Sequence, residues 1–331
     1  MANDKAVFPT KGYVLSVSDD SKNRPEHGSK GFENGMSIFF SLSDGSFLVV
    51  DGGQGNDSSS IDADHLYRRL RERADKNGVK DIVVSAWIFT HSHGDHTYFL
   101  RRFLPDYSDR VTVREFWFNP VGNCDWMLSR LAKFYPETPV VTLKAGEERE
   151  VADMRIEVLA TPEAVVEFDP EAINLDYNNS SLILRLHVGK KTVLITGDAG
   201  EQAMAYLNAT FDPEDLKCDV LQVPHHGYLK SRNRNNENWK RDHLFTDDQT
   251  ILAYAKISPT TAVFPCGELH FHAVSRPDSA YARNGGLHHF TTNSTMALLN
   301  QRSLAQVIIA GWYDGERPET AVYRCFVSSE D

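Results

Sequence analysis

The 331-residue sequence predicts an α/β protein in which two similar layers pack sheet against sheet within one domain. Strand hairpins and strand–helix units recur in both halves of the chain, and no linker separates the halves. In each half, histidine and aspartate clusters directly follow apolar runs that are typical of buried strands. Since α/β folds bind ligands at the carboxyl edge of a sheet, these clusters indicate a site at that edge.

The first half begins with a predicted hairpin, because two apolar runs, 36–42 and 46–51, flank an Asp-Gly turn. A helix follows from about Ser60, a suitable N-cap, to Asn77, where Gly78 ends it. The apolar run 82–89 predicts a buried strand, and a helix is expected to start near Asp95. The other expected elements are strands at 111–118, 140–143 and 154–159 and a helix at 125–135.

The second half repeats this organisation after residues 161–180, which are expected to form a loop. A polar insertion is expected at 230–250, and the core of the domain is expected to span about 36–300. The expected strands are 181–187, 192–196, 219–223, 261–264, 288–292, 296–299, 305–310 and 321–326, and the expected helices are 201–207, 249–257 and 278–283.

Composition excludes several classes of protein. No apolar run approaches the roughly 20 residues of a membrane span, and the N-terminus lacks a signal pattern, so a cytoplasmic protein is expected. Four scattered cysteines without C-x-x-C spacing fit reduced, mostly buried thiols. A net charge of −11 argues against extended nucleic-acid binding, although a small nucleotide substrate remains compatible with it.

The segment Thr90-His91-Ser92-His93-Gly94-Asp95-His96 carries the strongest chemical signal. His91 and His93 are two residues apart, so in an extended segment their side chains face the same way. Asp95 and His96 follow at the turn into the next helix and can reach a second point nearby. This arrangement favours two adjacent metal ions, and the alternative is a histidine-rich surface turn.

Two strand ends in the second half add further ligand types. Thr196-Gly197-Asp198 places a carboxylate at the expected sheet edge, although an aspartate there could also cap the next helix. Pro224-His225-His226-Gly227 ends the next strand with two histidines. Asn178-Asn179-Ser180 is a weaker signal, because asparagine and serine are ordinary loop residues.

Together, these motifs resemble the metallo-β-lactamase superfamily, on His91-x-His93-x-Asp95-His96, Gly197-Asp198 and Asp51-Gly52-Gly53. The runs 179–184, 194–198 and 219–227 are similar to the hydrolase branch of ComEC-type DNA-uptake proteins, and phosphorylcholine esterases look related. The resemblance implies a four-layer αββα sandwich of two mixed sheets that binds two metal ions. A role in DNA uptake itself is not supported, since those domains accompany a membrane channel.

The resemblance also implies a ligand set. His91 and His93 would hold the first ion, Asp95, His96 and His225 the second, and Asp198 would bridge them. Many superfamily members add a histidine just before the strand that here begins at Ser181, but this chain has Asp176, Tyr177, Asn178 and Asn179 there. An amide, a carboxylate or water completes the first site, or that site is weak. Retention of His93 favours Zn²⁺, and Mn²⁺ also suits the donors.

These residues support hydrolysis by a metal-bridging hydroxide, with Asp95 and Asp198 as catalytic groups and His226 or His270 as proton donor. The expected substrate is a phosphodiester, either a small molecule or a nucleotide-like phosphate ester. The basic segment 230–234 would accept an anion, or it is a solvated loop. The alternatives are a lactonase, thioesterase or β-lactamase acting on a carbonyl group, and a non-catalytic metal-binding module.

Overall fold

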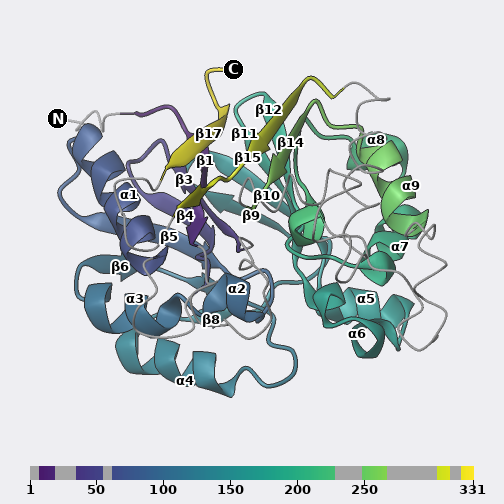
Figure 1. Ribbon diagram of the computed structural model, residues 1–331, viewed down its shortest axis with the longest axis horizontal. Helices are drawn as coiled ribbons and strands as arrows, with labels where there is room; N and C mark the ends of the chain where they lie inside the picture. Colours follow the sequence, from purple (N-terminus) through teal and green to yellow (C-terminus); the bar gives the residue numbers. More distant parts are fainter. Residues whose placement is uncertain (1–6, 19–34, 55–61, 228–247, 267–303, 314–321) are drawn as a thin grey trace.

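Two mixed β-sheets stack face to face, and helices cover the outer surface of each (Figure 1). This computed structural model describes residues 7–18, 35–54, 62–227, 248–266, 304–313 and 322–331. The arrangement confirms the predicted αββα sandwich.

The first sheet joins the two ends of the described chain. Its order is β17 (Tyr323–Ser328), β1 (Lys11–Leu15), β3 (Ser37–Ser41), β4 (Phe47–Asp51), β5 (Ile82–Ile88), β7 (Phe116–Trp117) and β8 (Val140–Val141), and β6 (Val111–Val113) also pairs with β5. Neighbours are antiparallel from β17 to β4 and parallel from β4 to β8. In Figure 1 the purple β1 and the yellow β17 lie side by side.

The second sheet follows the same mixed pattern. Its order is β15 (Gln306–Ile309), β14 (Thr261–Phe264), β13 (Val220–Gln222), β12 (Lys191–Ile195), β11 (Ile183–Val188), β10 (Met154–Ala160) and β9 (Glu148–Val151). Neighbours are parallel from β15 to β12 and antiparallel from β12 to β9. A small parallel pair is formed by β2 (Val17–Ser18) and β16 (Trp312–Tyr313).

The helices form the two outer layers. Against the first sheet pack α1 (Asp62–Lys76), α3 (Leu100–Tyr107) and α4 (Asp125–Phe134). Against the second pack α5 (Pro162–Phe168), α6 (Ala172–Leu175), α7 (Glu201–Thr210), α8 (Pro213–Leu216) and α9 (Asp248–Ile257). Within the described ranges, no helix has the length and apolar character of a membrane span.

Strand alternation explains how these layers hold together. In β4, Leu48 and Val50 pack between the sheets, whereas Phe47 and Val49 pack against the helices. All four side chains are fully buried, which stabilises the fold by about 1.5–3 kcal/mol for each. Among the described residues, three apolar clusters correspond to the three interfaces between the four layers.

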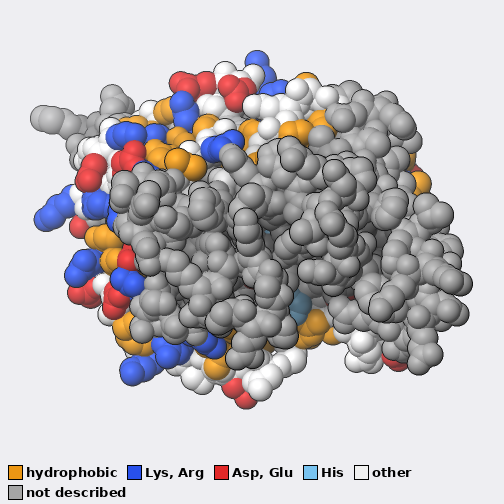
Figure 2. Space-filling model, viewed as in Figure 1, with side chains coloured by type: hydrophobic (Ala, Val, Ile, Leu, Met, Phe, Trp, Pro, Cys, Tyr) orange, Lys and Arg blue, Asp and Glu red, His pale blue; other side chains and the backbone are white. Residues whose placement is uncertain are grey.

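On the outer face of α1, charged side chains of both signs alternate. Figure 2 shows them along the left rim, on the side where α1 and α3 lie in Figure 1. Lys76 pairs with Glu72 at 2.8 Å, and Arg71 pairs with Asp75 at 2.6 Å. Because these cations are paired with carboxylates, this face does not present a uniformly basic surface to a nucleic acid.

The prediction of a loop at 161–180 is wrong, because this segment forms α5, α6 and a 3₁₀ turn, η3 (Tyr177–Ser180). The Thr161 hydroxyl accepts a hydrogen bond from Ala164 N at 3.4 Å, and Pro162 stands in the first turn. Both features favour the start of a helix at this position. The side chain of Val165 in α5 is buried against the second sheet.

The other predicted elements differ less from those in the structure. The strand expected at 111–118 is two short strands, β6 and β7, and the helix expected near Asp95 is α2 (Gly94–Thr97) followed by α3. Strand β9 was not predicted because it is an edge strand whose sequence, Glu-Arg-Glu-Val, is mostly polar and lacks an apolar run. The helix expected at 278–283 and the strands expected at 288–292 and 296–299 lie outside the described residues. None of the four cysteines forms a disulfide, and three are buried, as expected.

Candidate metal centre

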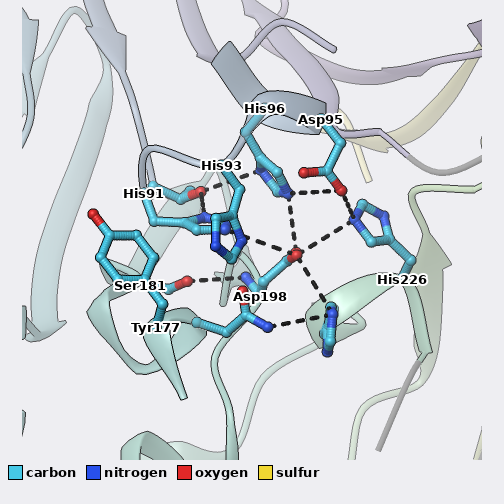
Figure 3. A network of polar contacts seen from close by, with 12 residues as sticks. His91, His93, Asp95, His96, Tyr177, Ser181, Asp198 and His226 are labelled. Atoms are coloured by element: carbon cyan, nitrogen blue, oxygen red, sulfur yellow. Dashed lines mark hydrogen bonds and ion pairs between the residues drawn. The ribbon is translucent and has the colours of Figure 1, made fainter. Parts of the chain in front are cut away.

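The end of β5 delivers the first histidines to the edge of the first sheet. After the strand, the buried Thr90 and His91 continue the chain, and His93 precedes α2 with extended backbone angles. The short helix α2 (Gly94–Thr97) then presents Asp95 and His96. Figure 3 shows all four side chains converging from this single segment.

A buried carboxylate on β4 orients this segment. Asp51 accepts hydrogen bonds from Thr90 N at 2.8 Å and from the Thr90 hydroxyl at 2.7 Å. Its Oδ2 also lies 2.7 Å from His96 Nδ1, so the other ring nitrogen, Nε2, points into the cluster. The sequence marked Asp51 only through its Asp-Gly-Gly motif at a strand end, and its contact with His96 was not predicted.

Asp198 comes from the second sheet, immediately after β12. Gln222 Oε1 accepts hydrogen bonds from Thr196 N and Gly197 N, both at 2.8 Å, and Asp198 N donates to Ser181 Oγ at 3.1 Å. Gly197 has φ +54°, and a Cβ there would lie 2.8 Å from Thr90 Cβ. This turn therefore needs glycine, and it holds the Asp198 carboxylate against the histidine segment of the first sheet.

The two histidines of the 3₁₀ turn η4 (Pro224–Gly227) diverge. Both have left-handed backbone angles, with φ 50° at His225 and 54° at His226, which costs roughly 1–2 kcal/mol for each residue. His226 Nδ1 donates to Pro265 O at 2.7 Å, and its Nε2 lies 3.2 Å from Asp95 Oδ2 and 3.5 Å from Asp198 Oδ2. His225 Nε2 lies 4.0 Å from Asp198 Oδ2 and 3.3 Å from Asn178 Nδ2.

Two groups of metal-capable side chains result, and they share Asp198. In each group, the nitrogen and oxygen atoms that could bind a metal lie within 4.8 Å of one another. The groups are His91, His93 and Asp198, and Asp95, His96, Asp198 and His226. Five of the six expected ligands are brought together here, but His226 stands in the second group where His225 was expected. His270 lies outside the described residues.

The buried carboxylates raise the pKa of two histidines of the cluster. Burial alone would lower the pKa of His96, but the carboxylates of Asp198, Asp51 and Asp95 outweigh it and hold that pKa well above its usual range. Burial opposes protonation of His226 too, but Asp198 and Asp95 raise its pKa to about 10.

The pKa values of Asp198 and His91 shift downward. Burial raises the pKa of the Asp198 carboxyl, yet His96 and His226 reverse this and hold it well below its usual range. Burial lowers the pKa of His91, and the neighbouring His96 adds to the effect. The buried carboxylates thus favour protonation of His96 and His226, whereas His91 favours its neutral form, and a bound metal ion would replace the protons of His96 and His226.

The donor set fits a divalent metal. His91 Nε2 is buried, lies 3.8 Å from Asp198 Oδ2, and has no hydrogen-bond partner within the described chain. An unpaired buried nitrogen costs about 1–3 kcal/mol, and coordination would satisfy it. Imidazole and carboxylate donors at such separations suit Zn²⁺, Mn²⁺ or Fe²⁺.

Comparison with known proteins identifies the family. Residues 31–238 match the metallo-beta-lactamase superfamily, so the chain belongs to that superfamily. A comparison with curated protein sequences gives no match.

Solved structures share the fold at low sequence identity. CmlA, a diiron β-hydroxylase from Streptomyces venezuelae, aligns with a TM-score of 0.52 and 12% identity over 96% of this chain and 54% of its own. The metallo-beta-lactamase fold protein YhfI from Bacillus subtilis aligns with a TM-score of 0.49 and 12% identity over 96% of this chain and 100% of its own. At these identities the likeness concerns the fold alone.

Proposed function

We propose that this protein is a dinuclear metal-dependent hydrolase whose substrate is a phosphodiester. The observation that carries the proposal is Asp198, one buried carboxylate shared by two groups of ligand-type atoms. In this assignment, His91, His93 and Asp198 hold the first ion. Asp95, His96, Asp198 and His226 hold the second.

Two divalent ions, Zn²⁺ or else Mn²⁺, would supply Lewis acidity and lower the pKa of bound water. The protein's own contribution is orientation. Asp51 fixes the ring of His96, while Gln222 and Ser181 fix the turn that carries Asp198. Side chains held in this way keep their geometry during the reaction, which lowers its reorganisation cost.

We assign the two histidines of η4 different roles from those expected. The hydrogen bond from His226 Nδ1 to Pro265 O leaves Nε2 as the ligand atom, a common arrangement for metal-binding histidines. The side chain of His225 is 19% exposed, whereas that of His226 is fully buried. His225 is therefore the better placed of the two to contact substrate and to donate a proton to a leaving group.

Two features support a phosphorus rather than a carbonyl substrate. The first is the Pro224–Gly227 motif, the most specific element of the resemblance to the ComEC-type hydrolase branch. The second is a cation over the Tyr98 ring: the Arg101 guanidinium lies 3.9 Å from the ring centroid. That ring packs against Gly94, between His93 and Asp95, so Tyr98 links Arg101 to the turn that carries these ligands, and a cation on this turn would favour an anionic substrate.

Hydrolysis of bis-p-nitrophenyl phosphate tests the proposal. Metal-stripped protein is reconstituted with Zn²⁺ or Mn²⁺ and compared with Asp198→Asn, which keeps the shape of the side chain but removes the shared charge. His187→Ala serves as the control, because His187 pairs with Glu157 on the strands away from the cluster.

Metal-dependent turnover that is lost in Asp198→Asn but kept in His187→Ala is the expected result. No turnover from protein that holds two metals would redirect the assignment to lactones and thioesters. Protein that binds no metal would contradict the proposal altogether.

A further inference from the structure

The two groups around Asp198 are unequal. Besides the shared carboxylate, the first has two histidines and the second has two histidines and an aspartate. We propose that Asn178, in η3, completes the first group and binds its metal ion through the side-chain oxygen Oδ1. This inference rests on the proposed function, because it presupposes two metal ions.

The burial of Asn178 is the first argument. The residue is 1% exposed, and its Oδ1 has no hydrogen-bond partner among the residues that the structure describes. Buried amide oxygens are almost always paired, and leaving one unpaired costs about 1–3 kcal/mol. A carbonyl-type oxygen with free lone pairs beside a metal cluster is a ligand available for coordination.

The position of the amide is the second argument. Asn178 Nδ2 donates to His225 Nε2 at 3.3 Å, and that nitrogen lies 4.0 Å from Asp198 Oδ2. Because His225 holds the amide nitrogen, the oxygen is the atom of the amide that remains free to bind a cation. His225 thus orients Asn178 and does not compete with it for the ion.

The neighbours of Asn178 contact two other members of the first group. The Tyr177 ring lies 5.1 Å from the His93 ring, and Ser181 Oγ accepts from Asp198 N. Figure 3 shows Tyr177 and Ser181 on the side of the cluster where His91 and His93 lie. The segment that carries Asn178 is therefore anchored to His93 at one end and to Asp198 at the other.

The chemistry of an amide ligand has a consequence for the two ions. A neutral oxygen donor binds Zn²⁺ less strongly than imidazole does, and it suits Mn²⁺ comparatively well. The first site is consequently the weaker Zn²⁺ site, and the two ions bind in separate steps. The second site, with its own aspartate in addition to Asp198, binds first.

Calorimetric titration of metal-stripped protein with Zn²⁺ tests this assignment. The absorption spectrum of the Co²⁺-substituted protein reports the coordination of each site. The wild type should take up two equivalents with different affinities. Asn178→Leu, which is similar in size but lacks a donor, should weaken the lower-affinity site by about 10- to 100-fold and leave the other unchanged. Asn178→His should tighten Zn²⁺ binding at the same site and change its Co²⁺ spectrum.

Three comparisons make the outcome decisive. Asn174→Leu, at an exposed position in α6, should leave both affinities unchanged. His225→Leu should change the weaker site by no more than a few-fold; a loss equal to that in Asn178→Leu would mean that Asn178 acts only through His225 and would overturn the assignment. Asn178→Asp keeps an oxygen donor, so weaker binding in that variant would also count against it, even if Asn178→Leu fails to fold.

The two proposals fail differently. If the wild type binds two ions and Asn178→Leu binds them equally well, the role of Asn178 is wrong and the hydrolase proposal stands. If the wild type binds no metal, both are wrong.

Discussion

Asp51 Oδ2 and His96 Nδ1 lie 2.7 Å apart, and both side chains are fully buried. The pair joins the end of β4 to α2 and fixes which nitrogen of His96 faces the metal cluster. Asp51 has φ 55°, a left-handed conformation that is uncommon for a residue other than glycine. The strand end is thus strained where its carboxylate meets the imidazole, as is common at functional sites.

Asp51→Asn should weaken metal binding by about 10- to 100-fold at the site that contains His96, because the orienting charge is lost while the shape remains. Calorimetric titration with Zn²⁺ measures this. Asp153→Asn is the control, since its carboxylate accepts a hydrogen bond from the Thr10 hydroxyl at 2.7 Å, far from the cluster in the sequence and in the fold. Equal metal affinities in the wild type and Asp51→Asn would show that the pair is only structural.

A second prediction concerns the two histidines of η4, with His226 as a metal ligand and His225 as the proton donor. His226→Ala should lose one equivalent of metal, because its Nε2 is a ligand in the proposed assignment. His225→Ala should retain both ions and lower turnover of bis-p-nitrophenyl phosphate by about 100-fold or more. Metal content after gel filtration, measured beside the turnover, separates the two effects. The opposite pattern would restore His225 as the ligand.

Gly197→Ala should destabilise the protein by about 1–3 kcal/mol more than Gly146→Ala. Both glycines have positive φ, 54° and 84°, but only at Gly197 would a Cβ meet other atoms, with Thr90 Cβ at 2.8 Å. The comparison therefore isolates the close approach from the backbone strain. Urea unfolding measures the free energies, and similar losses in the two variants would refute the steric argument.

Because His65 is buried, we expect the free energy of unfolding to decrease at acidic pH. Burial lowers its pKa from 6.5 to about 3, and the adjacent Arg69 guanidinium acts in the same direction. Below pH 6.5 the unfolded chain binds a proton that the folded protein does not. Stability is therefore lost as the pH falls from 6.5 towards 3, by about 1.4 kcal/mol per pH unit.

The test for His65 is the slope of stability against pH. In His65→Leu, the unfolding free energy should fall less steeply between pH 6 and pH 4 than in the wild type, whatever the starting value. His187→Ala, on a partly exposed strand position, controls for the removal of a histidine. An unchanged slope in His65→Leu would mean that other groups cause the acid sensitivity.

Sequence patterns predicted most of the strands and the histidine segment for a clear physical reason. Period-two burial in β10 and β11 and the apolar runs of β4 and β5 are local signals, and side chains at a strand end share one edge. The sequence alone therefore predicts one cluster that contains His91, His93, Asp95, His96 and Asp198.

What the sequence could not resolve depends on backbone angles and long-range contacts. The proposed choice of His226 over His225 as the ligand depends on two successive left-handed backbone conformations, which adjacency in sequence does not reveal. The proposed roles of Asp51 and Asn178 depend on partners 45 and 47 residues away in the chain. Strand β1 was not predicted for a similar reason, because it pairs with β17 from the opposite end of the sequence.

The division of the cluster between the two sheets affects how the protein unfolds. His91, His93, Asp95 and His96 follow strand β5 of one sheet, whereas Asp198 and His226 follow strands β12 and β13 of the other. A bound ion would therefore act as a cross-link between two halves that otherwise meet mainly through apolar side chains. Removing it should loosen the junction at this edge first, so the resistance of the β5–α2 segment to proteolysis would rise and fall with metal concentration.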